Sequence, residues 1–137
     1  MQLDKFTLKA QEALSEARQL AESRNHAQLE TEHLLGALMD QEGGLTMPIL
    51  ERIGANHAAL RQELEAKMNS LSRVTGSSQV SASNRVGKVL DSAQKEASKM
   101  KDSYTSTEHV LLALAQDGGW TSNLLKQHGI TLSLIHI

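Results

Sequence analysis

The chain has 137 residues, of which 39% are hydrophobic and only 2% aromatic, and its formal net charge is −2. This composition suits one compact domain with an aliphatic core, which favours packed helices over sheets. Interspersed charges of both signs predict no nucleic-acid partner. Cysteine is absent, which excludes disulfides and thiolate metal sites. No apolar run approaches the roughly 20 residues that span a bilayer, and the N-terminal segment lacks a signal-peptide core, so we expect a cytoplasmic protein without a membrane partner.

Four helices are predicted in the first half of the chain. Apolar residues at helical spacing indicate a first helix along residues 3–21, with Asp4 as its N-cap. A second helix is expected over residues 31–40, and a short third one ends at Gly54. Asn56 then caps a fourth helix. Residues 72–82 are rich in Ser, Thr and Gly and predict a linker.

The second half repeats the first. Thr31-Glu32-His33 recurs as Thr107-Glu108-His109, 76 residues later, and a long amphipathic helix is again expected before it, after Ser83. Gly129 ends the third helix of this copy, as Gly54 ends its counterpart. Helices of one periodicity are common, but shared breaks between successive helices indicate a duplicated unit.

The fourth helix of the second copy is predicted to be truncated. Thr131 reads as its N-cap, but residues 132–137 resemble one translated frame of a transposase sequencing adapter and are interpreted as a non-native tail. The domain is therefore divided into repeat 1 (about 1–71), the linker (72–82) and repeat 2 (about 83–131). Loss of the last helix is expected to expose Val89, Leu90 and Leu125 and to weaken repeat 2.

Catalytic and metal sites find little support in the sequence. Glu30 and His33 have the Glu-x-x-His spacing of di-iron bundles, but Ser106 takes the place of Glu30 in the second copy. No nucleophile, histidine and acid can be matched by spacing, so an autonomous enzyme is the weaker class of hypothesis. Trp120 is expected in the core or as a helix staple, and Tyr104 could serve either in packing or in binding.

The chain resembles the N-terminal repeat domain of the Clp ATPases, and that of the disaggregase ClpB more than its relatives. The resemblance covers the chain to about Thr131. It rests on the N-terminal sequence from Leu3 to Thr7, on Gln11-Glu12-Ala13, on the turn Gln41-Glu42-Gly43-Gly44 and on the run from Lys88 to Tyr104. It implies an all-α fold of two tandem four-helix Clp repeats with pseudo-twofold symmetry.

The same resemblance implies a non-catalytic role. Such a domain would bind unfolded or aggregated proteins, or an adaptor, and pass them to AAA+ modules of a homohexamer that needs ATP and Mg²⁺. This segment contains no G-x-x-x-x-G-K-[ST] loop, so we expect it to hold no cofactor itself and to precede the ATPase modules of a longer chaperone. A stand-alone Clp-repeat protein is an alternative.

The binding residues that the resemblance implies are Thr7, Asp102 and Glu108, between the repeats. Two neighbouring groove positions, apolar in relatives, hold Glu96 and His109 here. The resemblance to ClpC suggests a second ligand, because acids at the Thr-Glu-His motif recognise phosphoarginine there. By that analogy Glu32 and Glu108 would bind marked substrates, although both carboxylates also suit the positive end of a helix.

Overall fold

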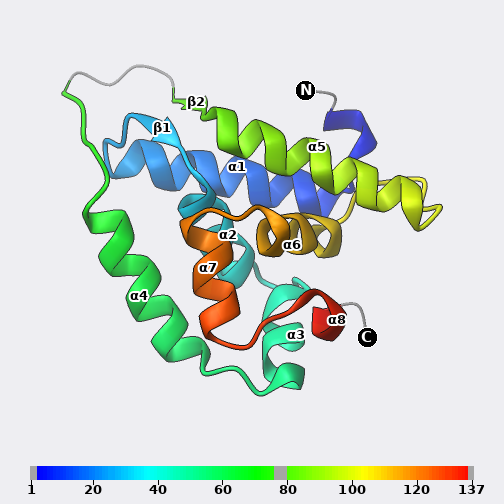
Figure 1. Ribbon diagram of the computed structural model, residues 1–137. Helices are drawn as coiled ribbons and strands as arrows, with labels where there is room; N and C mark the ends of the chain where they lie inside the picture. The colour runs from blue at the N-terminus through cyan, green and yellow to red at the C-terminus, as the bar shows by residue number, and fades with distance from the viewer. Residues whose placement is uncertain (1–2, 76–79, 136–137) are drawn as a thin grey trace.

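The computed structural model describes residues 3–75 and 80–135, and these fold into helices with two very short strands (Figure 1). The all-α prediction is confirmed. In chain order, the elements are η1 (Leu3–Lys5), α1 (Leu8–Ser23), β1 (Gln28–Leu29), α2 (Thr31–Asp40), α3 (Thr46–Ile53), α4 (His57–Asn69), β2 (Ser81–Ala82), α5 (Asn84–Lys99), α6 (Thr107–Gln116), α7 (Trp120–Gln127) and α8 (Leu132–Ile135).

The helices form two matching sets. Both ends of α5 and of α6 lie 76 residues after the corresponding ends of α1 and α2, and α8 begins 75 residues after α4. Helix α8 has four described residues and starts directly after Thr131, as predicted for a truncated last helix. Its Ile135 is buried against the core. Residues 136–137 lie outside the described residues, and the non-native origin of the tail stays a prediction.

The helix starts confirm one predicted cap, Asn56, and correct another. Asn56 and Ser83 accept hydrogen bonds from Ala59 N–H and Val86 N–H at 3.1 and 3.2 Å. The first long helix, however, begins three residues later than the predicted cap implies, because its N-cap is Thr7, whose Oγ1 accepts from Ala10 N–H at 3.1 Å. The prediction of Asp4 as N-cap was wrong, since Asp4 lies in the preceding 3₁₀ turn η1.

The two repeats are joined by backbone pairing, because a segment of each repeat pairs with a segment of the other. Phe6 of repeat 1 forms a parallel bridge with Thr105, just before α6. In the equivalent contact, β2 pairs in parallel with β1, just before α2. Phe6 and Ala82 are equivalent positions, and so are Thr105 and Leu29, so these are two copies of one contact. The last residues of the predicted linker are thus part of the packed domain, and Val80 is buried.

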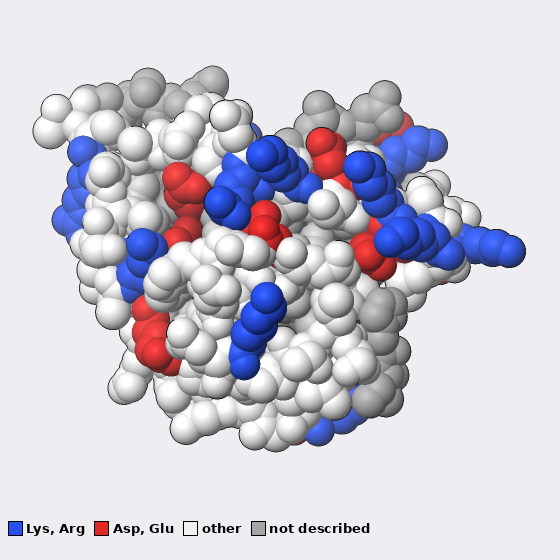
Figure 2. Space-filling model, viewed as in Figure 1, with Lys and Arg blue, Asp and Glu red and all other residues white. Residues whose placement is uncertain are grey.

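Helices α2 and α6 form the centre of the domain. All residues of α2 except its last are buried, and α6 is similarly enclosed. In Figure 1 these two helices lie beneath α1 and α5, with α4, α7, α3 and α8 around them. Charged side chains gather over the upper part of this face, where Lys and Arg alternate with Asp and Glu, while its lower part is largely uncharged (Figure 2).

Repeat 2 keeps its core covered. Val89, Leu90 and Leu125 are each at most 1% exposed, so the expectation that they would be uncovered was wrong. Helix α8 packs on both α6 and α3, and Ile130 and Ile135 join the core from this end of the chain. Four residues of α8 are therefore enough to complete a continuous core, and exposed apolar faces no longer give a reason to expect a weaker second repeat.

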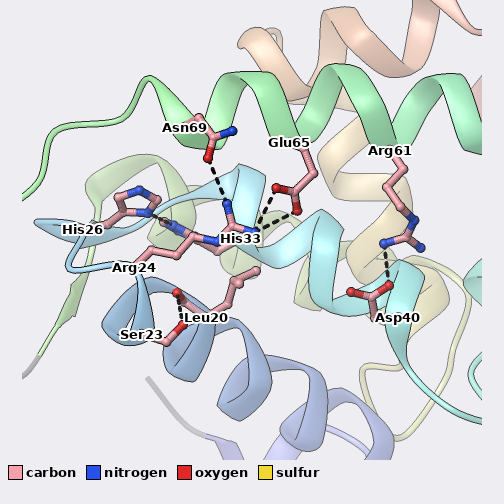
Figure 3. A network of polar contacts seen from close by, with 9 residues as sticks. All are labelled: Leu20, Ser23, Arg24, His26, His33, Asp40, Arg61, Glu65 and Asn69. Carbon is pink, nitrogen blue, oxygen red and sulfur yellow. Dashed lines mark hydrogen bonds and ion pairs between the residues drawn. The ribbon is translucent and has the colours of Figure 1, made fainter.

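Polar contacts fasten α4 to the end of α1 (Figure 3). Arg24 donates from Nη2 to both carboxylate oxygens of Glu65 at 2.8 and 2.9 Å, and from Nη1 to Asn69 at 3.4 Å. Arg61 reaches back from α4 to Asp40 at the end of α2, at 2.5 Å. The Arg24 guanidinium thus bonds two residues of α4, and these contacts hold α4 against the end of α1.

A buried histidine pair closes the same region. Glu30 N–H donates to Nδ1 of His33 at 2.8 Å, so that nitrogen carries no proton. His33 Nε2 lies 2.7 Å from His26 Nδ1, and both rings are at most 2% exposed. His33 therefore donates to His26, and both rings are neutral. Burial lowers the pKa of His33 to about 4, with added repulsion from His26 and Arg24. Burial also lowers the pKa of His26, as do Arg24 and Arg73.

Acidification is expected to destabilise the domain through this pair. In the unfolded chain His33 takes up a proton near pH 6.5, whereas in the folded chain it does so only near pH 4. The free energy of unfolding should thus be fully maintained above pH 6.5. Between pH 6.5 and 4 it should fall by about 3 kcal/mol in total on account of His33. Urea denaturation at half-unit pH steps measures this. His33→Gln should flatten that part of the profile, whereas His57→Gln, at a partly exposed histidine, should leave it unchanged. Equal slopes in all three proteins would contradict the assignment.

The repeats differ where α4 crosses α2. Gly36 of α2 corresponds to Leu112 of α6, and a Cβ built on Gly36 would lie 3.5 Å from Leu20 Cδ2 and 3.7 Å from Met68 Cε. These are ordinary contact distances, so a methyl group fits and a larger side chain does not.

Substitutions at Gly36 should therefore change stability in opposite directions. Gly36→Ala is expected to raise the free energy of unfolding by about 0.5–1 kcal/mol through helix propensity. Gly36→Leu, which copies repeat 2, should lower it by about 1–3 kcal/mol through overpacking. Gly87→Ala is the matched control, because a Cβ there meets nothing within 4 Å and should give the propensity gain alone. If Gly36→Leu proved as stable as the parent in urea, this account of the packing would be overturned.

Candidate protein-binding site

The predicted residues gather where the start of α1 meets the segment before α6. Thr7 N–H donates to Thr105 C=O at 2.9 Å, and Thr105 N–H donates to Lys5 C=O at 2.8 Å. Thr7 is thereby held beside Thr105, and Tyr104 precedes it directly. Thr105 is buried, whereas Thr7 is partly exposed and Tyr104 is 56% exposed. The repeat exchange thus places residues from both ends of the chain on one surface.

Asp102 is fixed in this surface by His109. The Nε2 of His109 donates to Asp102 Oδ2 at 2.9 Å, and its Nδ1 accepts from Ser106 N–H at 2.8 Å. The histidine ring is only 3% exposed, while the Asp102 side chain is 47% exposed. Both ring nitrogens are engaged, so His109 positions Asp102 from below. His109 is thus buried beneath Asp102, and the contact with a partner that was expected of it stays a prediction.

Glu108 is the second residue of α6 and is partly exposed. Its carboxylate suits the positive helix end, and within the described residues it forms no hydrogen bond or ion pair. We call Thr7, Asp102, Tyr104 and Glu108, with His109 beneath them, the Glu108 cluster. It offers carboxylate and hydroxyl groups together with an aromatic ring.

Sequence reasoning missed the apolar side chains next to this cluster. Leu8, which follows Thr7, is 77% exposed, and Leu3 is 43% exposed. The available signal was that Leu8 falls outside the apolar stripe that α1 turns to the core. A cavity of about 190 Å³ begins at Leu3 and runs between α1 and α5, lined by Leu14, Leu29, Leu90 and Arg18 among others.

Glu32 lies elsewhere, at the equivalent place in the other repeat. The residues there that correspond to the Glu108 cluster are Ser83, His26, Gln28 and Glu32, with His33 beneath, and we call them the Glu32 cluster. Glu32 is 6% exposed, and burial raises its pKa, with Lys67 opposing that rise among smaller influences. The two predicted glutamates are therefore not brought together, and only Glu108 is open to solvent.

Two further candidates are decided by their contacts. Glu96 accepts from Gln116 at 3.1 Å and lies 3.8 Å from Lys99, so it is tied into the surface beside α6. Trp120 is 36% exposed at the start of α7, with Lys67 5.5 Å from its ring centroid, so it does not lie in the core, and the alternative role as a helix staple stays a prediction.

The Glu-x-x-His spacing has a structural explanation. His33 accepts from Glu30 N–H, as His109 accepts from Ser106 N–H. The two residues of the Glu-x-x-His spacing are thus hydrogen-bonded to each other at the start of a helix. Among residues 3–75 and 80–135, no three His, Cys, Asp or Glu side chains come together as metal ligands would. Within the same residues, no helix has the length and hydropathy needed to cross a membrane.

Solved structures with this fold include the N-terminal domains of several Clp-type ATPases. The Hsp104 N-terminal domain from Candida albicans matches with a TM-score of 0.84 and 23% identity, covering 96% of this chain and 86% of that one. The ClpV1 N-terminal domain from E. coli matches with a TM-score of 0.85 and 22% identity, over 98% and 83%. A ClpV N-domain in complex with a VipB peptide matches with a TM-score of 0.76 and 19% identity, covering 92% of this chain and 80% of that one. These similarities concern the fold.

Sequence comparison gives the family. The chaperone protein ClpB of Vibrio cholerae is 38% identical over 132 residues, and that of Clostridium perfringens is 34% identical over 137. Both alignments cover 96% of this chain but only 15% and 16% of the relatives, so the chain spans about a sixth of their length. The family profile described as the Clp repeat (R) N-terminal domain matches residues 5–128. The chain therefore belongs to the Clp repeat N-terminal domain family.

Proposed function

We propose that this domain binds unfolded or aggregated proteins through the Glu108 cluster and passes them to the ATPase motor of a ClpB-like chaperone. The sequence identity of 38% to a ClpB chaperone supports this role, and so does the structural similarity to a Clp-type N-domain in complex with a peptide. On this proposal the segment itself is non-catalytic. ATP and Mg²⁺ would be bound by AAA+ modules of a homohexameric parent chain, in the cytoplasm.

The observation that carries the proposal is that carboxylate, aromatic and apolar side chains are exposed close together. Asp102 and Tyr104 are about half exposed, Glu108 has no partner within the described residues, and Leu8 is the most exposed large apolar side chain described. A chain without stable structure offers unpaired backbone N–H groups, basic side chains and apolar side chains. Carboxylates can accept from the first two, while Leu8 and Tyr104 can cover the third.

A rigid support favours binding over a structural role for these carboxylates. Asp102 is oriented by a buried histidine whose other nitrogen is fixed by the backbone of Ser106. A preorganised acceptor loses little freedom when a partner binds. About half of the Asp102 side chain remains exposed beside this support.

A second candidate ligand is phosphoarginine on marked substrates or adaptors. It is favoured by the position of Glu108 at the first turn of α6, where the free N–H groups of a helix start and a carboxylate lie close together. N–H groups suit a phosphate, and the carboxylate suits the guanidino nitrogens. A stand-alone adaptor would use the same surface.

Titration of the isotope-labelled domain with an unphosphorylated polypeptide that lacks stable structure tests the proposal by NMR. Saturable shifts are expected at the amides of Thr7, Asp102 and Glu108. The double variant Asp102→Asn with Glu108→Gln should bind at least about tenfold more weakly, because charged acceptors become neutral.

The control is Asp91→Asn with Glu51→Gln, which removes the same charge at two exposed positions outside the cluster. It should bind like the parent. If the amide signals of a folded domain do not shift, binding of unphosphorylated polypeptides is rejected. Shifts that occur only with a phosphoarginine peptide would favour the second candidate. Equal loss of affinity in both double variants would indicate a general charge effect.

A further inference from the structure

In repeat 1, a short segment after α4 pairs with the turn that follows α1. Its centre is an antiparallel bridge between His26 and Arg73. Two backbone hydrogen bonds flank this bridge, from Ala27 N–H to Ser72 C=O at 3.2 Å and from Val74 N–H to Asn25 C=O at 2.8 Å. The backbone edge of residues 25–27 is thus covered by an extended stretch of the domain's own chain, residues 72–74.

The equivalent turn of repeat 2 has the same backbone conformation. Both turns pass through a left-handed residue, Lys101 with φ 59° and Asn25 with φ 58°. In both, the N–H of the next residue donates to the C=O five positions before it, at 2.9 Å in repeat 2 and 3.0 Å in repeat 1. Lys101 C=O and Ser103 N–H are therefore presented as their counterparts are in repeat 1.

This second edge, residues 101–103, is open. Within the part of the chain that the structure describes, Lys101 C=O and Ser103 N–H take part in no backbone hydrogen bond, and all three residues are exposed. The bridge from Phe6 to Thr105 begins two residues further on and does not use these groups. Unpaired N–H and C=O groups in a row are a template for pairing with another extended chain.

The central residue of the open edge is acidic. Asp102 takes the place of His26, and its side chain is 47% exposed. His26 and Arg73 form a non-hydrogen-bonded pair, in which the two facing residues approach most closely. A segment that paired with the open edge in the same way would place its central residue opposite Asp102. A basic side chain there would meet a carboxylate, and opposite charges directly across stabilise a strand pair.

We infer that the Glu108 cluster receives its partner as an added strand along residues 101–103, in the antiparallel pairing that residues 72–74 show in repeat 1. The partner is an extended stretch of unfolded polypeptide with a basic residue opposite Asp102. The inference rests on the proposed function and adds the mode of recognition. Main-chain hydrogen bonds bind many sequences alike, and the facing carboxylate selects among them by charge.

The charge of the open edge favours a different polypeptide over a second copy of this domain. Symmetric antiparallel pairing of two such edges would place Asp102 opposite Asp102, and like charges directly across destabilise a strand pair. A polypeptide without stable structure presents free N–H and C=O groups at every residue, so it can align any of its basic residues with Asp102.

The test uses the end-blocked pentapeptide Leu-Ser-Arg-Val-Thr, which copies residues 71–75, and the isotope-labelled domain. The peptide should shift the Ser103 amide signal saturably. It should also give a nuclear Overhauser effect between the α-protons of Asp102 and of the peptide arginine, because these protons lie close together in a non-hydrogen-bonded pair.

Two ester peptides test the register. An ester in place of the valine amide removes the donor that corresponds to Val74 N–H, and it should weaken binding about threefold to tenfold. The matched control has the ester at the threonine, because Thr75 N–H forms no bond with the covered edge in repeat 1. It should bind like the unmodified peptide.

On the domain, Ser103→Pro removes the N–H of the open edge, whereas its control Ser103→Ala keeps it. Only Ser103→Pro should lower the affinity, and amide spectra report that both variants are folded. Shifts at the Glu108 cluster with equal affinity for both ester peptides would overturn the inference and leave the proposed function intact. Slow hydrogen exchange of the Ser103 amide in the free domain would also overturn it, because the edge would already be occupied by the domain itself or by a second copy. Absence of shifts with this peptide and with a longer unstructured polypeptide would reject the proposed function as well.

Discussion

The exchange of backbone pairing between the repeats is the constraint on which the rest of this domain depends. The segment before each long helix has its hydrogen-bonding partners in the segment before the short buried helix of the other repeat. Buried N–H and C=O groups need such partners, so neither repeat is complete by itself. The same exchange places Thr7 beside Thr105 and so creates the Glu108 cluster. Fold and candidate site therefore have a common origin.

One divergence between the copies lies at a single hydrogen bond. His33 and His109 both accept a backbone N–H through Nδ1, and each donates through Nε2 to the residue seven positions earlier. In the first repeat that residue is His26, which is neutral and buried. In the second it is Asp102, which is charged and half exposed. One residue type thus decides whether the shared support ends in a closed core or in an accessible carboxylate.

The fold was largely predictable because its signals are local. Helix periodicity, the caps Asn56 and Ser83 and the breaks at Gly54 and Gly129 specify the elements, and the spacing of the Thr-Glu-His motif specifies the repeat. The start of α1 was misplaced, because Asp4 and Thr7 are both good capping residues and the choice depends on the bridge between Phe6 and Thr105. That bridge joins distant parts of the chain, and no local pattern announces it. The site was predictable in its residue types but not in its exposure, because burial of His109 and Glu32 depends on what packs over them. Trp120 illustrates the same limit, since Lys67 approaches it from the distant helix α4.

The bridge from Phe6 to Thr105 also affects how the chain folds during synthesis. Its partners are separated by nearly the whole domain, and contacts between such distant residues form slowly because a long loop must close first. On the ribosome, Phe6 emerges early and must wait for Thr105 to be translated. At typical elongation rates of about 5–20 residues per second this wait lasts several seconds. Throughout that interval the first repeat exposes apolar side chains of its own, so the nascent domain passes through the kind of aggregation-prone state that chaperones bind.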